Sequence, residues 1–205
     1  MSTKQKSNIL VLILLVGVVF FSALGYWLWV RSTALPVLGE IESFTLETVE
    51  GQDYQPKNDK LKLVMFYDSD CNENCQNTLT VMEQLQNNFS ELELLGRDVE
   101  LLSLLMNTEE KHLQQVKKYV SNHNIDSNGW KFLTGSSEEL EKVKKQISAA
   151  SDEKVGQDTY ISKIYLIDKK GRIRGDYETG GTETNDVKTI TKEVKNLVRV
   201  QPAAE

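Results

Sequence analysis

One stretch of the chain, residues 9–30, carries no charged side chain and reads ILVLILLVGVVFFSALGYWLWV. About 20 consecutive apolar residues are what a helix needs to cross the hydrocarbon core of a bilayer. Tyr26, Trp27 and Trp29 lie at the end of the run, where aromatic rings favour the membrane interface. The run therefore predicts a single transmembrane anchor.

The flanking charges predict the orientation of this anchor. Lys4 and Lys6 precede the run, whereas Arg31 alone follows it closely, so residues 1–8 are expected to stay in the cytoplasm. The alternative is a cleaved signal peptide, because the segment Ala23-Leu24-Gly25 offers small residues at positions that a signal peptidase prefers. The length of the run favours the uncleaved anchor. Either way the rest of the chain lies outside the cytoplasm, where disulfides form.

Length and charge limit the remaining organisation. With 205 residues the chain has room for one domain and its anchor, so we expect a linker at 31–39, a domain at 40–200 and a tail at 201–205. The formal net charge of -6 argues against nucleic acid as a partner, because binding to phosphates requires clustered Lys and Arg.

The domain has a mixed α/β pattern. Residues 44–49 predict a first strand and turn, and the apolar runs 61–67 and 99–106 predict strands buried on both faces. Residues 132–135 are expected to be extended, and a strand at 164–167 turns into an antiparallel partner. Apolar residues at helical spacing predict helices around Leu79, Met82, Leu85 and Phe89, around Leu113, Val116 and Val120, around Leu140, Val143 and Ile147, and around Val187, Ile190, Val194 and Leu197.

This order of elements predicts an α/β, thioredoxin-like fold with an N-terminal β-hairpin, preceded by a single transmembrane helix. Parallel strands need helices on the faces of the sheet, and the amphipathic segments supply them. Trp130 and Phe132 are expected in the core of this domain rather than in a ligand site.

The chain contains only two cysteines, Cys71 and Cys75, which follow a predicted buried strand and begin a predicted helix. A structural disulfide framework would need more cysteines at wider spacing. Unpaired N–H groups and the dipole at a helix start favour a thiolate, and soft thiolates suit Cu(I). The spacing therefore predicts a functional pair that forms a disulfide or binds copper, with two inert buried thiols as the alternative.

Several features together resemble the SCO (SenC-like) family. They are the C-x-x-x-C pair after a buried strand, the N-terminal anchor, the segment GWKFLTG at 129–135 and the strand-turn-strand at 164–173. The resemblance spans roughly residues 40–198. It implies a thioredoxin-like fold and a role in building the copper centre of cytochrome c oxidase. In that family two Cys and one distant His bind copper, and the pair also exchanges disulfides.

The family positions carry over only in part. Cys71 and Cys75 occupy the two cysteine positions, but Tyr160 stands where the family His is expected. Gln76 replaces the Pro that follows the second Cys, and Asn107 replaces an Asp after the second buried strand. The missing imidazole disfavours the standard copper site, above all for Cu(II).

Other residues are candidates for the missing copper ligand or stand at its position in the chain. Met106 ends a strand expected to run parallel to the one before Cys71, and its thioether is a soft ligand, although a Met in an apolar strand is usually core. His112 and His123 are expected to be solvated surface residues rather than ligands. Tyr160 is expected to donate or accept hydrogen bonds rather than bind metal.

Three functions follow as hypotheses. The first is a membrane-anchored SCO-like accessory protein, a metallochaperone that handles Cu(I) or reduces an oxidase subunit through the cysteine pair. The second is a thiol-disulfide oxidoreductase without metal, acting on an oxidase subunit or another exported thiol protein. The third is a scaffold with a structural disulfide. The missing His favours the second, whereas the absence of a Pro before residue 164, where thioredoxins hold one opposite the pair, favours the first.

Overall fold

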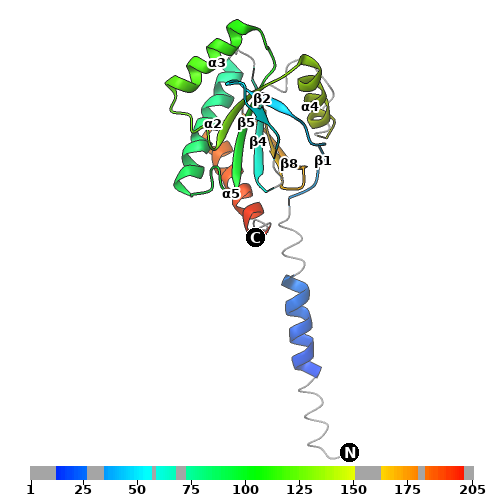
Figure 1. Ribbon diagram of the computed structural model, residues 1–205. Helices are drawn as coiled ribbons and strands as arrows, with labels where there is room; N and C mark the ends of the chain where they lie inside the picture. The colour runs from blue at the N-terminus through cyan, green and yellow to red at the C-terminus, as the bar shows by residue number, and fades with distance from the viewer. Residues whose placement is uncertain are drawn as a thin grey trace, which may run out of the picture. The chain divides into compact units, whose positions relative to one another are not determined.

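The computed structural model describes residues 13–26, 35–56, 59–67, 73–150, 163–179 and 183–200 (Figure 1). The chain divides into two compact units, Met1–Leu35 and Pro36–Glu205. Each unit is described by itself.

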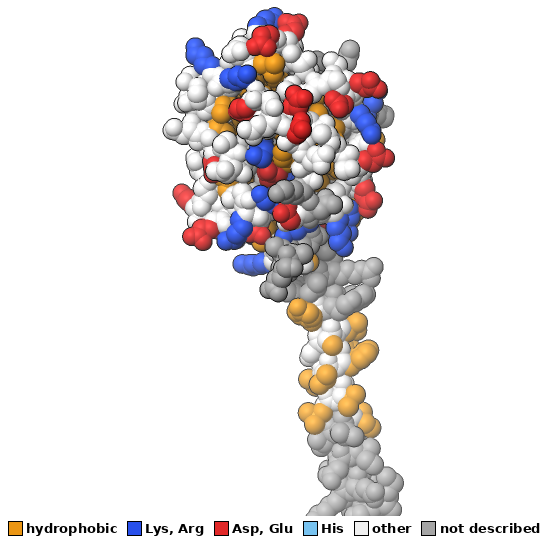
Figure 2. Space-filling model, viewed as in Figure 1, with side chains coloured by type: hydrophobic (Ala, Val, Ile, Leu, Met, Phe, Trp, Pro, Cys, Tyr) orange, Lys and Arg blue, Asp and Glu red, His pale blue; other side chains and the backbone are white. Residues whose placement is uncertain are grey.

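In the first unit, residues 13–26 form a helix with apolar side chains on every visible side (Figure 2). Phe20 and Phe21 are 62% and 71% exposed. Among the residues that the structure describes, no helix is both long and apolar enough to span a bilayer. The predicted anchor at 9–30 extends on both sides beyond the described helix.

The second unit is built on an eight-stranded mixed sheet in the order β1-β8-β7-β4-β5-β6-β2-β3. Its strands are β1 (Gly39–Glu40), β2 (Leu46–Thr48), β3 (Asp53–Tyr54), β4 (Leu61–Tyr67), β5 (Val99–Leu105), β6 (Trp130–Thr134), β7 (Lys163–Ile167) and β8 (Arg172–Glu178). The described helices of this unit are α2 (Glu73–Glu91), α3 (Glu110–Asn122), α4 (Ser137–Ala150) and α5 (Glu183–Val200).

The centre of the sheet agrees with the sequence pattern. Strand β4 runs parallel to β5, which runs parallel to β6, and every residue of β4 and β5 is buried. Strands β2 and β3 pair antiparallel and form the predicted N-terminal hairpin. Because β4, β5 and β6 are parallel, their carboxyl ends meet at one edge of the sheet, which we call the carboxyl edge.

Helices cover both faces of the sheet. Figure 1 shows α2 and α5 on one side and α4 on the other. Leu140, Val143 and Ile147 of α4 belong to a buried core cluster with strand residues such as Val64 and Tyr165. On the opposite face, the apolar residues of α2 that predicted a helix are buried, as are Trp130 and Phe132, whose rings stack at 5.2 Å. These predictions from periodicity are confirmed.

Strand β1 crosses the predicted boundary between linker and domain, because Gly39 belongs to the predicted linker and Glu40 to the predicted domain. Gly39 pairs with Ile173, and the N–H of Leu38 donates to the Ile173 carbonyl at 2.9 Å. Arg174 Nε donates to the Pro36 carbonyl at 2.9 Å. The folded unit therefore begins at Pro36. Its first strand is two residues long and forms by pairing with β8, so it carries no periodicity of its own.

The central strands also bury charged and polar side chains. Lys62 and Glu100 are register neighbours in β4 and β5, and both are buried. Glu100 accepts a hydrogen bond of 2.6 Å from Tyr54 Oη, and Lys62 Nζ donates to the Lys60 carbonyl at 3.0 Å. Such pairing is the rule for polar groups removed from water, and it allows charged side chains inside a sheet that is otherwise apolar.

Candidate functional site

The two cysteines follow β4 in the chain, after a strand end that belongs to the carboxyl edge of the sheet. Strand β4 ends at Tyr67 and α2 begins at Glu73, so Cys71 lies in the connection between them, outside the described residues. Cys75 belongs to the first turn of α2, and its side chain is also outside the described part, as is all of Tyr160. The described backbone has a strand end at Tyr67 and a helix start at Glu73 on the two sides of Cys71, and the site formed by the pair stays a prediction.

Helix α2 is held from two sides. The hydroxyl groups of Thr78 and Thr179 are hydrogen-bonded at 2.5 Å, which fastens α2 to the residue that follows β8. One and a half turns further on, Glu83 accepts a hydrogen bond from the Tyr119 hydroxyl of α3. Burial, together with this bond to Glu83, raises the pKa of Tyr119, so that it donates as a neutral phenol. Helix α2 is therefore held against α3 and against the end of β8.

The Tyr119–Glu83 bond gives a first prediction. Tyr119→Phe keeps the ring contact with Phe132, whose centroid lies 5.9 Å away, and removes only the hydroxyl. We expect the free energy of unfolding in urea to fall by about 1 kcal/mol. A double-mutant cycle with Glu83→Gln isolates the pair, and additive effects of the two substitutions would show that the bond does not stabilise the fold.

The burial of His112 contradicts the prediction from the sequence. This residue was expected on the surface, but it is 1% exposed. The buried face of α3 contains His112 and Val116, with Tyr119 partly buried beside them, and is thus turned from the predicted stripe through Leu113 and Val120. His123 is exposed as expected, and its ring stacks on Tyr119 with centroids 4.0 Å apart.

The two ring nitrogens of His112 have different surroundings. Nε2 lies 3.3 Å from Asn107 Nδ2 and 3.7 Å from a carboxylate oxygen of Glu109. Nδ1 has no hydrogen-bond partner among the described residues. Leaving a buried polar group unpaired costs about 1–3 kcal/mol, so this nitrogen requires an explanation. In the sequence, His112 lies four residues before Val116, which places the two side chains on one face of the helix. This spacing is the signal that could have predicted the burial of His112.

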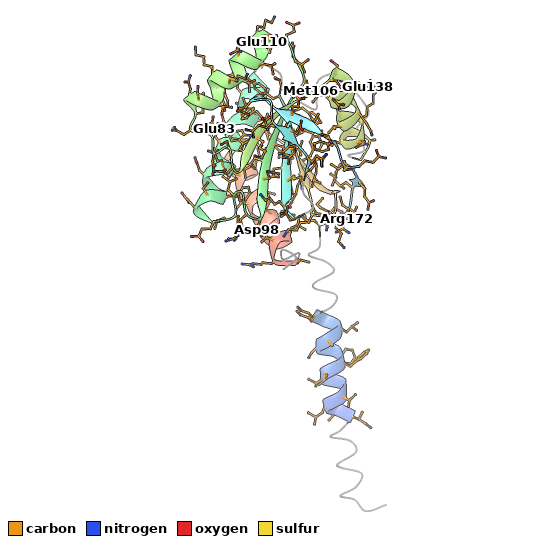
Figure 3. The ribbon with its side chains drawn as sticks, in the orientation of Figure 1. Glu83, Asp98, Met106, Glu110, Glu138 and Arg172 are labelled. Carbon is orange, nitrogen blue, oxygen red and sulfur yellow. The ribbon has the colours of Figure 1, made fainter. Side chains whose placement is uncertain are left out.

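Met106 lies at the carboxyl edge as predicted. Its N–H donates to the Tyr67 carbonyl at 2.9 Å, next to the end of β4. Its side chain is half-buried and packs against the core cluster that includes α4. Figure 3 shows Met106 at the same end of the domain as Glu110, with Asp98 and Arg172 at the opposite end. The thioether has a packing role on the α4 face, and copper ligation by it stays a prediction.

Within the described ranges, no group of three or more His, Cys, Asp or Glu side chains could hold a metal ion. A metal site of the predicted kind needs the sulfur atoms of Cys71 and Cys75, and these lie outside the described ranges.

The comparisons with known proteins agree with this arrangement. The family model described as SCO1/SenC matches residues 39–199. The SCO1 protein homolog of Bacillus subtilis (strain 168) is 28% identical over 167 residues, which cover 78% of this chain and 84% of the relative.

Solved structures show the same fold at low sequence identity. BsSco, a member of the Sco family of cytochrome c oxidase assembly proteins, is 23% identical with a TM-score of 0.62, over 80% of this chain and 99% of its own. Yeast Sco1 with copper bound is 21% identical with a TM-score of 0.58, over 78% of this chain and 94% of its own. A SCO1/SenC family lipoprotein from Bacillus anthracis str. Ames is 21% identical with a TM-score of 0.63, over 80% and 97%.

The structural likeness confirms the predicted thioredoxin-like fold of the second unit. The family match covers nearly all of that unit, from the first residue of β1 to the last turn of α5. The chain belongs to the SCO1/SenC family.

Proposed function

We propose that this chain is a membrane-anchored accessory protein that helps to assemble the copper centre of cytochrome c oxidase. The observation that carries the proposal is the position of its only two cysteines, between β4 and the first turn of α2, in a domain of this family. BsSco belongs to a family of oxidase assembly proteins, and yeast Sco1 holds copper, which supports the same role here.

The chemistry of the cysteine pair suits Cu(I) as cargo. Thiolates are soft ligands, and two of them within one helical turn provide a low-coordinate site that can pass the ion to a receiving protein. The N–H groups at the start of α2 favour the thiolate form. Cys71 and Cys75 would bind the ion, and a copper-receiving oxidase subunit outside the cytoplasm would accept it.

Thiol reduction without a metal is the second candidate, and it is favoured by the disulfide switch identified in BsSco. In this reaction the two thiols of Cys71 and Cys75 are oxidised to a disulfide. The target disulfide takes up the two electrons and two protons and becomes a dithiol. An oxidase subunit or another exported thiol protein would be the target.

The experiment that separates these functions uses the reduced chain and the variant Cys71→Ser/Cys75→Ser. Cu(I) binding is titrated against a chromogenic chelator, and reduction of a disulfide-bonded peptide is followed in the same preparations. Tight stoichiometric copper binding that the variant lacks supports the copper role. Peptide reduction without copper binding supports the second candidate instead.

The proposed anchor gives a separate prediction. Val18 and Phe21 are exposed on the apolar helix at 13–26, and an Arg at the centre of a transmembrane helix costs about 2.5–3.5 kcal/mol. Val18→Arg/Phe21→Arg is therefore expected to remove the protein from the carbonate-resistant membrane fraction, whereas Val18→Leu/Phe21→Leu should leave it there. A wild-type protein found in the soluble fraction, shortened at its N-terminus, would show a cleaved signal peptide instead.

A further inference from the structure

We infer that one exposed face of α5 is a docking surface for the phosphate groups of anionic membrane lipids. This surface, which we call the basic face, carries Lys188, Lys192, Lys195 and Arg199. The inference rests on the membrane anchor of the proposed function, because the anchor is what keeps the domain beside a bilayer. It does not depend on copper binding or on thiol exchange.

The four cations of the basic face lie on one side of α5. They follow one another at intervals of four, three and four residues, which places them in one row along the helix. Lys188, Lys192 and Arg199 are exposed, and Lys195 is half-buried. The opposite side of the helix is apolar and buried in the domain, and it consists of Val187, Ile190, Val194 and Leu197.

A groove of about 390 Å³ follows the basic face. It is lined by the four cations, by Thr191 and Asn196 of α5, and by Asn88 of α2, whose amide donates to the Thr191 hydroxyl oxygen at 3.4 Å. Among the residues that the structure describes, no carboxylate lines this groove. Glu193, which is next to Lys192 in the sequence, accepts a hydrogen bond from Tyr177 of β8 and therefore points toward the sheet.

Helix α4, on the other face of the sheet, shows the ordinary arrangement of surface charges (Figure 1). Its exposed lysines Lys142 and Lys145 line a groove together with Glu138 and Glu141. Lys142 also lies 3.2 Å from a carboxylate oxygen of Glu42. The lysines of α4 are thus neutralised locally, whereas the basic face of α5 is left with a surplus of positive charge.

The chemistry of the basic face fits phosphate. Lys and Arg donate hydrogen bonds to phosphate oxygens, and Arg can do so with two parallel N–H groups. The amide groups of Asn88 and Asn196 and the hydroxyl group of Thr191 add neutral donors beside the cations. Like charges four residues apart destabilise a helix, so an anion that neutralises the row also stabilises α5. A surface of anionic lipids attracts each Lys or Arg that comes near it.

Helix α5 runs from the carboxyl edge of the sheet to the opposite edge, which we call the amino edge. Thr78 of α2 is hydrogen-bonded to Thr179, and Asn88 of α2 to Thr191 of α5, so the two helices run in the same direction. Helix α2 follows β4 and leads back to the start of β5. The last turns of α5, with Lys195 and Arg199, therefore lie toward the amino edge.

The folded unit also begins beside the amino edge. Strand β7 is antiparallel to β4, so the turn between β7 and β8 lies at this edge. The guanidinium group of Arg174 donates to the Pro36 carbonyl at 2.9 Å and to an Asp168 carboxylate oxygen in that turn at 3.0 Å. Pro36 is therefore close to the turn.

The short connection to the predicted anchor selects lipid as the anion. Residues 31–35 separate the anchor at 9–30 from Pro36, and five residues span at most about 18 Å. When the anchor is inserted in a bilayer, the amino edge must stay within this reach of the membrane surface. Lipid phosphates are then the anions that the end of α5 meets at all times.

The test is lysine acetylation of the full-length chain in lipid nanodiscs, with each modified lysine quantified by mass spectrometry. One set of discs contains phosphatidylcholine alone, and the other contains equal parts of phosphatidylcholine and phosphatidylglycerol. We expect Lys188, Lys192 and Lys195 to react about five- to tenfold more slowly in the anionic discs. The control lysines Lys142 and Lys145 of α4 should react equally in both. High salt should remove the difference, because it screens the attraction.

A charge-reversal variant tests whether the basic face itself causes the protection. Lys192→Glu/Lys195→Glu should abolish the protection of Lys188 in anionic discs. The matched variant Lys142→Glu/Lys145→Glu reverses the same number of charges on α4 and should leave Lys188 protected. Far-UV circular dichroism checks that both variants are folded, and the comparison of the two disc types on the wild type does not depend on either variant.

The outcomes separate this inference from the proposed function. Equal acetylation of the wild type in both discs overturns it, as does protection of Lys188 that survives Lys192→Glu/Lys195→Glu. Equal protection by inorganic phosphate in neutral discs shows a site for soluble anions and also overturns it. A chain that stays with anionic discs alone supports the basic face but refutes the anchor. Loss of Cu(I) binding would refute the copper function and leave these results unchanged.

Discussion

Replacing both cysteines, in Cys71→Ser/Cys75→Ser, is expected to weaken Cu(I) binding on the order of a thousandfold or more. A serine hydroxyl is a hard and neutral donor, whereas Cu(I) prefers the soft thiolate, so the variant loses both sulfur ligands together. A factor of a thousand corresponds to about 4 kcal/mol of binding free energy. The measurement is competition with a chromogenic Cu(I) chelator, with the full-length reduced chain in detergent.

The two single variants act as controls for this result. Cys71→Ser and Cys75→Ser each keep one thiol, so each should retain weak copper binding while losing the ability to form an intramolecular disulfide. Peptide reduction should therefore stop in both single variants, whereas copper affinity falls in steps. If all three variants bind copper and support oxidase assembly as the wild type does, the pair is only a structural disulfide and the proposal is wrong.

The elements that the sequence predicted well are those with strong local signals. Residues 61–67 and 99–106 are mostly apolar over a full strand length, and they contain β4 and β5 at the centre of the sheet. Helices α2, α4 and α5 carry apolar residues at a spacing that only one helix face can explain. The strand-helix junction at the cysteine pair follows from the same two signals.

The features that the sequence missed depend on long-range contacts. Strand β1 exists because β8 offers an unpaired edge at Ile173, more than a hundred residues away. The burial of Lys62 and Glu100 depends on which strands become neighbours. His112 was missed for the same reason. The contact between Tyr119 and Glu83 helps to determine which face of α3 packs against the domain. Because His112 is polar, it does not contribute to the apolar pattern from which a buried helix face is predicted.

The turn between β7 and β8 holds a buried ionic cluster formed by Asp168, Arg172 and Arg174. Asp168 is fully buried, and one of its carboxylate oxygens lies 2.7 Å from an Arg172 guanidinium nitrogen and 3.0 Å from an Arg174 nitrogen. The other oxygen accepts from the backbone N–H groups of Lys170 and Arg172 at 2.8 and 3.1 Å. Since Arg174 also holds the Pro36 carbonyl, the cluster ties the first residues of the folded unit to β8.

Asp168→Ala is expected to lower the free energy of unfolding by about 3–5 kcal/mol, because it deprives the buried Arg174 of this carboxylate. The control is Asp53→Asn, at an exposed carboxyl group on β3, which should change stability by about 0.5 kcal/mol or less. Unfolding is followed by far-UV circular dichroism in urea. Arg172 lies at the end of the domain opposite Met106 in Figure 3, so Cu(I) affinity of the folded variant should match the wild type.

The same cluster predicts how stability depends on pH. Burial by itself would raise the pKa of Asp168, but hydrogen bonds from Arg172, Arg174 and two backbone N–H groups outweigh it and lower the pKa from 3.8 to about 2. A lowered folded-state pKa means that the stabilisation is complete above the unfolded pKa and is lost as the pH falls. Asp168 should therefore contribute about 2 kcal/mol that disappears between about pH 4 and pH 2. Asp168→Asn should lose this part of the acid dependence, and an acid limb identical to that of the wild type would show that Asp168 is not the group that titrates.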